Sequence, residues 1–145
     1  MAQDVRVVRQ FAPEPAEVLA AFTDADRWAQ WMWPPHLQTV VKTDPRDGGR
    51  FSVRSEVADL GVSGTYRAVR MPEDDGPGYL DLTWQWDGES HATRVLVQVD
   101  SADRRAAGTI LSVTHTENRD ADETARHEQG WNDCLDRLAE FLVAS

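Results

Sequence analysis

The sequence predicts an α+β fold in which a curved antiparallel β-sheet of about seven strands wraps around a long C-terminal helix, with two short helices after the first strand. In the segment 120–142 apolar residues recur at helical spacing and end in Leu135, Leu138 and Leu142. Between residues 37 and 116, short segments alternate apolar and polar residues and are separated by turn-forming residues, a pattern typical of hairpins. Most of the strands have one apolar face, so the sheet has one buried side, and only the long helix is large enough to cover it. The sheet must therefore curve around that helix.

The elements before the sheet are short. The first strand is expected over Val5–Phe11, where valines recur, and the prolines Pro13 and Pro15 end it. Apolar residues then recur at helical spacing in two short stretches, and Pro34 with Pro35 ends the second of them. Six further strands are expected over 37–42, 51–57, 64–69, 80–86, 95–99 and 109–116.

The long helix is expected to start at Asp120, with Glu123 as its capping-box partner. Gly130 interrupts this helix, and a glycine there costs roughly 0.5–1 kcal/mol relative to alanine. Either another backbone approaches closely at Gly130, or there is open space for a ligand beside Trp131. Arg137 lies about two turns further along the same side, so this side is a flank of the apolar face. We expect the short helix around Trp31 to pack there.

Composition restricts the function. The 145 residues are expected to form one domain, 1–145. The net charge is −10, with 15 Lys and Arg residues and no basic run, which argues against nucleic acid and against an anionic membrane as partners. One cysteine, Cys134, permits no internal disulfide. No apolar signal stretch and no run of 18 apolar residues occurs, so we expect a cytoplasmic protein.

The chemistry-bearing residues predict no catalytic or metal centre. No nucleophile-elbow motif is present, and Cys134 lies on an apolar helix face, where an inert buried thiol is expected. His115 or Glu128 could act as an acid or base on a bound compound, but no residue pair demands a reaction. We therefore expect no cofactor, and binding rather than catalysis. The histidines show no paired ligand spacing, so no metal site is expected; they are His36, His91, His115 and His127.

Short motifs in order along nearly the whole chain carry a family resemblance. They are Ala12-Pro13 with Val18, Ala21-Phe22-Thr23-Asp24, Trp31 with Pro34, Asp44 with Arg46, Gly48 and Gly49, Gly64 with Tyr66, Thr83-Trp84, Gly108-Thr109 with Leu111 and His115, and Gly130-Trp131 with Leu135 and Leu138. With these motifs the chain resembles the START-like, or SRPBCC, superfamily and its helix-grip fold. Within that superfamily it is similar to the branch named for activators of the heat shock protein 90 ATPase. The chain departs from the usual Trp-Trp-small-Pro run, because it reads Trp31-Met32-Trp33.

Three functions follow from the resemblance. The first is binding of a small apolar or aromatic molecule in a cavity between the sheet and the C-terminal helix. The second is a co-chaperone role, in which the domain activates a heat shock protein 90 ATPase; a single small acidic domain argues against it. The third is a cyclase or hydrolase that acts on a hydrophobic substrate in the cavity. We expect the first, with a small hydrophobic molecule as partner, and the sequence leaves a homodimer open.

The candidate ligand-binding residues lie on the inward faces of the expected elements. We expect His115, Tyr66 and His127 to be the polar anchors, and His115 to orient the ligand rather than to support folding. The alternative is that His115 and Tyr66 merely satisfy each other or the backbone, as buried polar groups must. The full set is Trp28, Trp31, Phe51, Val53, Tyr66, Leu82, Trp84, Trp86, Val97, Val113, His115, His127 and Trp131.

Overall fold

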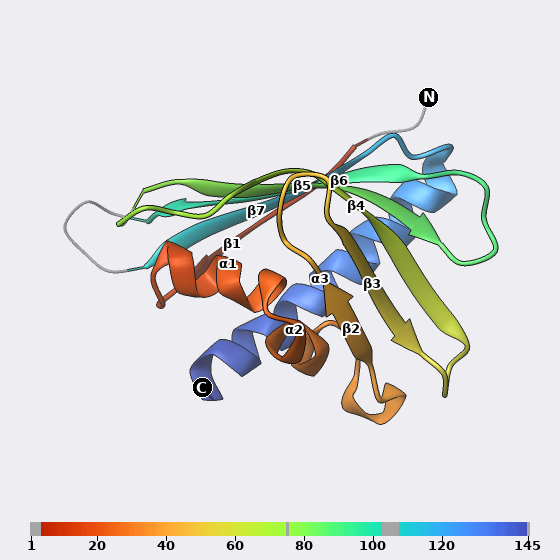
Figure 1. The fold of residues 1–145 in the computed structure, drawn as a ribbon, viewed down its shortest axis with the longest axis horizontal. Helices are drawn as coiled ribbons and strands as arrows, with labels where there is room; N and C mark the ends of the chain where they lie inside the picture. The colour runs from red at the N-terminus through yellow and green to blue at the C-terminus, as the bar shows by residue number, and fades with distance from the viewer. Residues whose placement is uncertain (1–3, 75, 103–107, 145) are drawn as a thin grey trace.

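The computed structural model describes residues 4–74, 76–102 and 108–144, and its largest element is a seven-stranded antiparallel sheet (Figure 1). The strand order is β1-β7-β6-β5-β4-β3-β2, so consecutive strands from β2 to β7 are neighbours and β1 joins the far edge beside β7. This is the curved sheet that the alternating pattern predicts. The strands are β1 (Val5–Phe11), β2 (Val40–Thr43), β3 (Arg50–Ser55), β4 (Leu60–Arg70), β5 (Gly78–Trp86), β6 (Thr93–Ser101) and β7 (Thr109–Thr116).

The helices lie on the concave side of the sheet. In Figure 1 the long helix α3 (Ala121–Ala144) runs beneath the sheet, and α1 (Pro15–Thr23) and α2 (Ala25–Trp31) lie beside its C-terminal half. Trp131, Leu135 and Leu138 of α3 are buried against the sheet, as the helical spacing predicts. Within the described residues, no helix combines the length and the apolar character needed to cross a membrane.

Side-chain caps start two of the helices. Asp24 Oδ1 accepts hydrogen bonds from the backbone N–H groups of Asp26 and Arg27, which begins α2. Asp120 Oδ1 accepts the N–H of Glu123 and begins α3. The predicted capping box forms only one of its two hydrogen bonds as expected. The carboxylate of Glu123 accepts the backbone N–H of Arg119 rather than that of Asp120. Glu123 is thereby tied to the residue before the cap.

The strand boundaries differ from the prediction around β2 and β3. Leu37 ends a short 3-10 helix, η1 (Pro35–Leu37), and the left-handed backbone of Gln38 turns the chain before Val40 starts β2. The third strand stops at Ser55, whose hydroxyl accepts the N–H of Ala58 and closes a turn. Local hydrogen bonding therefore overrides the apolar alternation at both ends.

The flank of α3 holds the end of α2, which confirms the expected contact with the short helix. The guanidinium of Arg137 donates to the carbonyl oxygens of Trp31 (3.0 Å) and Met32 (2.8 Å). The thiol of Cys134 donates to the same Met32 oxygen. Arg137 thus supplies hydrogen bonds to carbonyls that a helix end leaves without partners. A Cβ built on Gly130, by contrast, meets no atom of the described residues within 4 Å outside the neighbouring backbone of α3.

Candidate functional site

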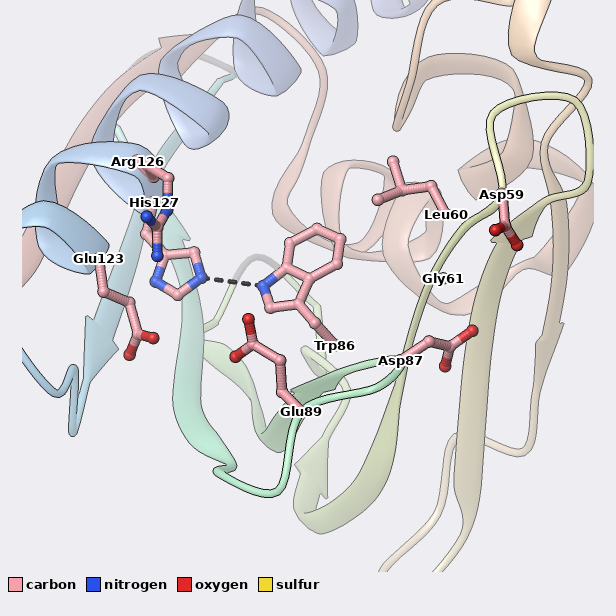
Figure 2. A pocket seen from close by; sticks show the side chains of 9 residues that line it. All are labelled: Asp59, Leu60, Gly61, Trp86, Asp87, Glu89, Glu123, Arg126 and His127. Atoms are coloured by element: carbon pink, nitrogen blue, oxygen red, sulfur yellow. Dashed lines mark hydrogen bonds between the residues drawn. The ribbon is translucent and has the colours of Figure 1, made fainter.

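A cleft opens where the first turns of α3 face the start of β4 and the end of β5 (Figure 2). Its volume is about 440 Å³, which lies in the usual range for small-molecule sites. Figure 2 shows the indole of Trp86 crossing this space, with its nitrogen directed at His127. The lining residues are Asp59, Leu60, Gly61, Trp86, Asp87, Glu89, Glu123, Arg126 and His127.

A smaller recess of about 50 Å³ adjoins the cleft. Trp86 and His127 line both spaces, so these two side chains form a shared wall. Gly130 lies at an opening of the recess, because it lines the recess and is also exposed. The recess has room for only a water molecule or a small chemical group. Its lining residues are Met32, Trp33, Trp84, Trp86, His127, Gly130, Trp131 and Cys134.

Near-parallel rings form the junction of the two spaces. Trp33 and Trp86 stack with their centroids 6.3 Å apart and their planes at 16°. Trp86 and His127 have the same centroid separation, with planes at 11°. Three flat rings from the α2–η1 connection, β5 and α3 therefore share nearly one orientation. A planar molecule can lie against such a wall with offset stacking.

Behind this wall, His115 is fully buried and both of its ring nitrogens are hydrogen-bonded. Trp131 Nε1 donates to His115 Nδ1 at 3.0 Å. An indole nitrogen can only donate, so His115 Nδ1 is unprotonated and the ring proton is on Nε2. His115 Nε2 then donates to the Thr93 hydroxyl (2.6 Å), which donates to the carbonyl oxygen of Trp84. His115 is therefore held as one neutral tautomer.

His127 is held as the opposite tautomer. Trp86 Nε1 donates to His127 Nε2 at 3.0 Å, so the proton of His127 is on Nδ1 and is donated to Asn118 Oδ1 (2.6 Å). The amide nitrogen of Asn118 in turn donates to the backbone oxygen of His115. The two imidazole rings stack with centroids 3.9 Å apart. Each histidine thus accepts from one tryptophan and donates to one polar side chain.

Burial disfavours charge on this pair. Burial, with a smaller contribution from the neighbouring His127, lowers the pKa of His115 to about 2. Burial also lowers the pKa of His127 below its usual value. Because neither ring has an unused lone pair or proton, neither can take up or release a proton without losing one of these hydrogen bonds. The pair is a neutral wall rather than an acid–base device.

Carboxylates surround the cleft, and arginines hold three of them. Arg119 binds Glu123 (2.7 Å) and Glu89 (2.9 Å), and Arg54 binds Asp87 (2.7 Å). Burial alone would raise the pKa of Glu123, but its hydrogen bonds to the backbone and side chain of Arg119 outweigh burial and lower it. Glu123 is therefore ionised at neutral pH and structural. The cleft has an acidic rim and an aromatic wall.

The structure brings together some of the predicted site residues and separates the others. Trp86 and His127 line both spaces, and Trp84 and Trp131 line the recess. His115 lies one hydrogen bond behind Trp131. The remaining predicted residues line neither the cleft nor the recess; they are Trp28, Trp31, Phe51, Val53, Tyr66, Leu82, Val97 and Val113.

Packing between the predicted residues explains this separation. The ring centroid of Phe51 lies within 5.8 Å of the ring centroids of Trp28, Tyr66 and Trp84. These aromatic side chains therefore fill the space that a larger cavity would need. Trp31 donates to the carbonyl oxygen of Ala21. Tyr66 and His115 do not bond to each other, because the Tyr66 hydroxyl bonds to Thr43. Tyr66 and His115 are therefore both hydrogen-bonded, but to other side chains than the sequence suggests.

Sequence reasoning missed most of the cleft. Asp59, Asp87 and Glu89 lie at or beside turns, where polar residues are usual, and no local pattern shows that these turns face α3. Leu60 begins β4, which starts earlier than the sequence predicts. The sequence did contain a signal that could have identified Trp33 as a site residue, because it follows Trp31 in a tryptophan-rich run. Glu128, a candidate acid or base, lies on the exposed side of α3.

Solved structures share this fold over almost the full chain. The AHSA1 (SPO3351) protein from Silicibacter pomeroyi is 25% identical, with a TM-score of 0.70, and the match covers 98% of this chain and 99% of that one. PFC0360w, an HSP90 activator from Plasmodium falciparum, is 17% identical, with a TM-score of 0.74 and coverage of 97% and 96%. DynU16, from the dynemicin biosynthetic locus, is 24% identical with a TM-score of 0.76. The match covers 98% of this chain but 48% of DynU16, so this chain spans about half the length of that protein.

The family comparison agrees with the motifs and the fold. Among curated proteins the search finds no match. The family described as "Activator of Hsp90 ATPase homolog 1-like protein" matches residues 13–143, from just after β1 almost to the end of α3. Both the branch and the helix-grip fold that the sequence resembles are thereby confirmed. The chain belongs to the Activator of Hsp90 ATPase homolog 1-like family.

Proposed function

We propose that this protein binds a small, planar aromatic molecule at the junction of the cleft and the recess. The observation that carries the proposal is the wall of near-parallel rings, in which Trp86 and His127 border both spaces and Trp33 borders the recess. The rings of the ligand would lie in the cleft against Trp86, and its narrowest end would enter the recess. The cleft volume of about 440 Å³ suits a compound of two or three fused rings.

The proposal includes no reaction. The ring nitrogens of His115 and His127 are all engaged in hydrogen bonds within the protein. The rim carboxylates Asp87, Glu89 and Glu123 are paired with arginines. Acid–base chemistry needs a group within reach of the substrate with a proton or lone pair to exchange. The two histidines offer neither, and ion pairs with arginine hold the three carboxylates in place, which supports binding over the cyclase or hydrolase alternative.

Gly130 provides a direct test. No backbone approaches it, so the open-space explanation of this glycine is the one that the geometry supports. We expect Gly130→Ala to raise the free energy of unfolding by about 0.5–1 kcal/mol, because alanine restricts the unfolded chain and favours the helix. Gly130→Leu places a large side chain at the opening of the recess. It should weaken binding of 2-acetylnaphthalene at least about tenfold without unfolding the protein.

The measurement is an NMR titration of each variant with 2-acetylnaphthalene, together with urea unfolding. Gly130→Ala serves as the matched control, since it changes the backbone entropy and barely fills the recess. Equal affinity in Gly130→Leu and the parent protein would place the ligand elsewhere. Loss of stability in Gly130→Ala would contradict the open space.

The co-chaperone alternative rests on the family name and on the fold shared with PFC0360w, an HSP90 activator. We expect this chain to leave the ATPase rate of a heat shock protein 90 unchanged at micromolar concentration. Its net charge of −10 spreads carboxylates over the surface, whereas the cores of protein interfaces are depleted in charge. The assay compares the chain with an activator protein of the same ATPase. A several-fold stimulation would favour the co-chaperone role over ligand binding.

A further inference from the structure

The ring N–H of Trp84 is buried and has no hydrogen-bond partner within the part of the chain that the structure describes. Its side chain is 2% exposed, and Nε1 has no hydrogen-bond acceptor among the described residues. Four other tryptophans do have acceptors: Trp28 donates to Met32 Sδ, Trp31 to Ala21 O, Trp86 to His127 and Trp131 to His115. A buried donor without a partner costs about 1–3 kcal/mol, so such groups are rare unless something else satisfies them.

Trp84 lies where a ligand could satisfy it. It lines the recess together with Trp86 and Trp131, whose rings are 6.2 Å and 5.4 Å from its own. The nitrogens of those two neighbours are engaged with His127 and His115. Thr93, opposite Trp84 in the β5–β6 pairing, is also engaged. The apolar lining of the recess therefore includes one residue, Trp84, whose hydrogen-bond donor is unused.

The residues that line the recess are electrically neutral: among the described residues, no Asp, Glu, Lys or Arg lines it. Arg137 contacts two of the lining residues, Met32 and Cys134, but its guanidinium is engaged by the carbonyl oxygens of Trp31 and Met32. Burial raises the pKa of the Cys134 thiol to about 11, and this thiol donates to Met32 O. His127 is held neutral by its hydrogen bonds. An anion at this place would lose its hydration for a single neutral donor, after passing the acidic rim formed by Asp59, Asp87 and Glu89.

We propose that Trp84 Nε1 is the polar recognition element of the site, and that the bound aromatic compound presents a neutral carbonyl oxygen to it. A ketone or quinone oxygen needs only a donor, which is what the recess offers. This inference rests on the proposed function and narrows it, from planar aromatic compounds in general to uncharged aromatic ketones. In this arrangement Trp84 recognises the carbonyl oxygen of the ligand, and Trp86 stacks on its rings.

The test uses three naphthalenes that differ in one group. In 2-acetylnaphthalene the group is C=O, in 2-isopropenylnaphthalene the isosteric C=CH₂, and in 2-naphthoate a carboxylate. The Kd ratio of the isopropenyl to the acetyl compound should fall about two- to tenfold in Trp84→Phe, which corresponds to one neutral hydrogen bond. The matched control is Trp33→Phe, which removes indole bulk from the same recess and should leave the ratio unchanged. The carboxylate should bind most weakly.

A second readout needs no stable variant at Trp84. In the parent protein the Trp84 Nε1–H resonance can be assigned among the six indole signals through its ring neighbours Phe51 and Trp131. It should move downfield with the acetyl compound and not with the isopropenyl compound. If the acetyl and isopropenyl compounds both bind saturably and the Trp84 Nε1–H resonance does not move, the carbonyl contact is wrong and the proposed function stands. An ordered water that stays bound to Trp84 would give this result. Absence of saturable binding by all three naphthalenes rejects both.

Discussion

Lowering the pH from about 7.5 to about 5 is expected to destabilise this protein by at least 2 kcal/mol, through His115 and His127. In the unfolded chain a histidine takes up a proton as the pH falls below its ordinary pKa of 6.5. In the folded chain burial keeps the pKa of His115 at about 2, so it stays neutral. The unfolded state therefore binds more protons than the folded state, and acid favours unfolding.

The pH window follows from these two values. The stabilising effect of neutral His115 is complete above pH 6.5 and is lost as the pH falls from 6.5 towards 2. One such group accounts for about 2 kcal/mol at pH 5, since each pH unit below 6.5 contributes about 1.4 kcal/mol. His127 adds to the loss, because burial lowers its pKa as well, although the nearby Glu123 opposes this shift.

Urea unfolding at several pH values measures the effect, and ring-nitrogen NMR identifies its source. The spectra should show the proton of His115 on Nε2 and that of His127 on Nδ1, as their tryptophan partners require. The exposed His36 supplies a control: His36→Gln should leave the pH dependence unchanged. Stability that stays level between pH 7 and pH 5 would mean that the histidines are not held neutral.

The fold could be predicted from the sequence because its signals are local and periodic. The strand Val5–Phe11 and the strand at 109–116 have the predicted boundaries, and α3 starts one residue after its predicted cap, Asp120. Other boundaries moved: Gln38, with its left-handed backbone, delays the start of β2 to Val40, and β4 starts at Leu60, four residues before its predicted start. Apolar periodicity carries no information about a turn residue such as Gln38.

The site was predictable only in part, because an inward-facing aromatic residue does not reveal whether it fills a space or lines one. Phe51 and Trp84 both point inward, yet Phe51 packs between other rings and Trp84 lines the recess. The hydrogen-bond partners of His115 come from β6 and α3, at sequence separations of 22 and 16 residues. Such pairings depend on register and ring orientation, which the order of residues along one strand does not specify.

His115→Phe is the substitution with the largest expected effect on folding, a loss of about 2–4 kcal/mol in the free energy of unfolding at neutral pH. The phenyl ring cannot accept the N–H of Trp131, so a buried donor is left without its partner, at a cost of about 1–3 kcal/mol. The larger ring also strains the stack with His127, whose centroid lies 3.9 Å away. The structure thus leads to the opposite of the expectation from sequence, in which His115 orients a ligand rather than supports folding.

A double-mutant cycle separates the hydrogen bond from the packing. Trp131→Phe removes the donor that His115→Phe strands, so the double variant should be more stable than the sum of the two single losses predicts, by about 1 kcal/mol. The pH provides a second check. Because the variant lacks the buried neutral imidazole, the difference between parent and variant should shrink by about 2 kcal/mol between pH 7.5 and pH 5. If His115→Phe keeps the parent stability and instead weakens binding of 2-acetylnaphthalene, the imidazole serves the ligand, and the tryptophan–histidine hydrogen bonds contribute little to the fold.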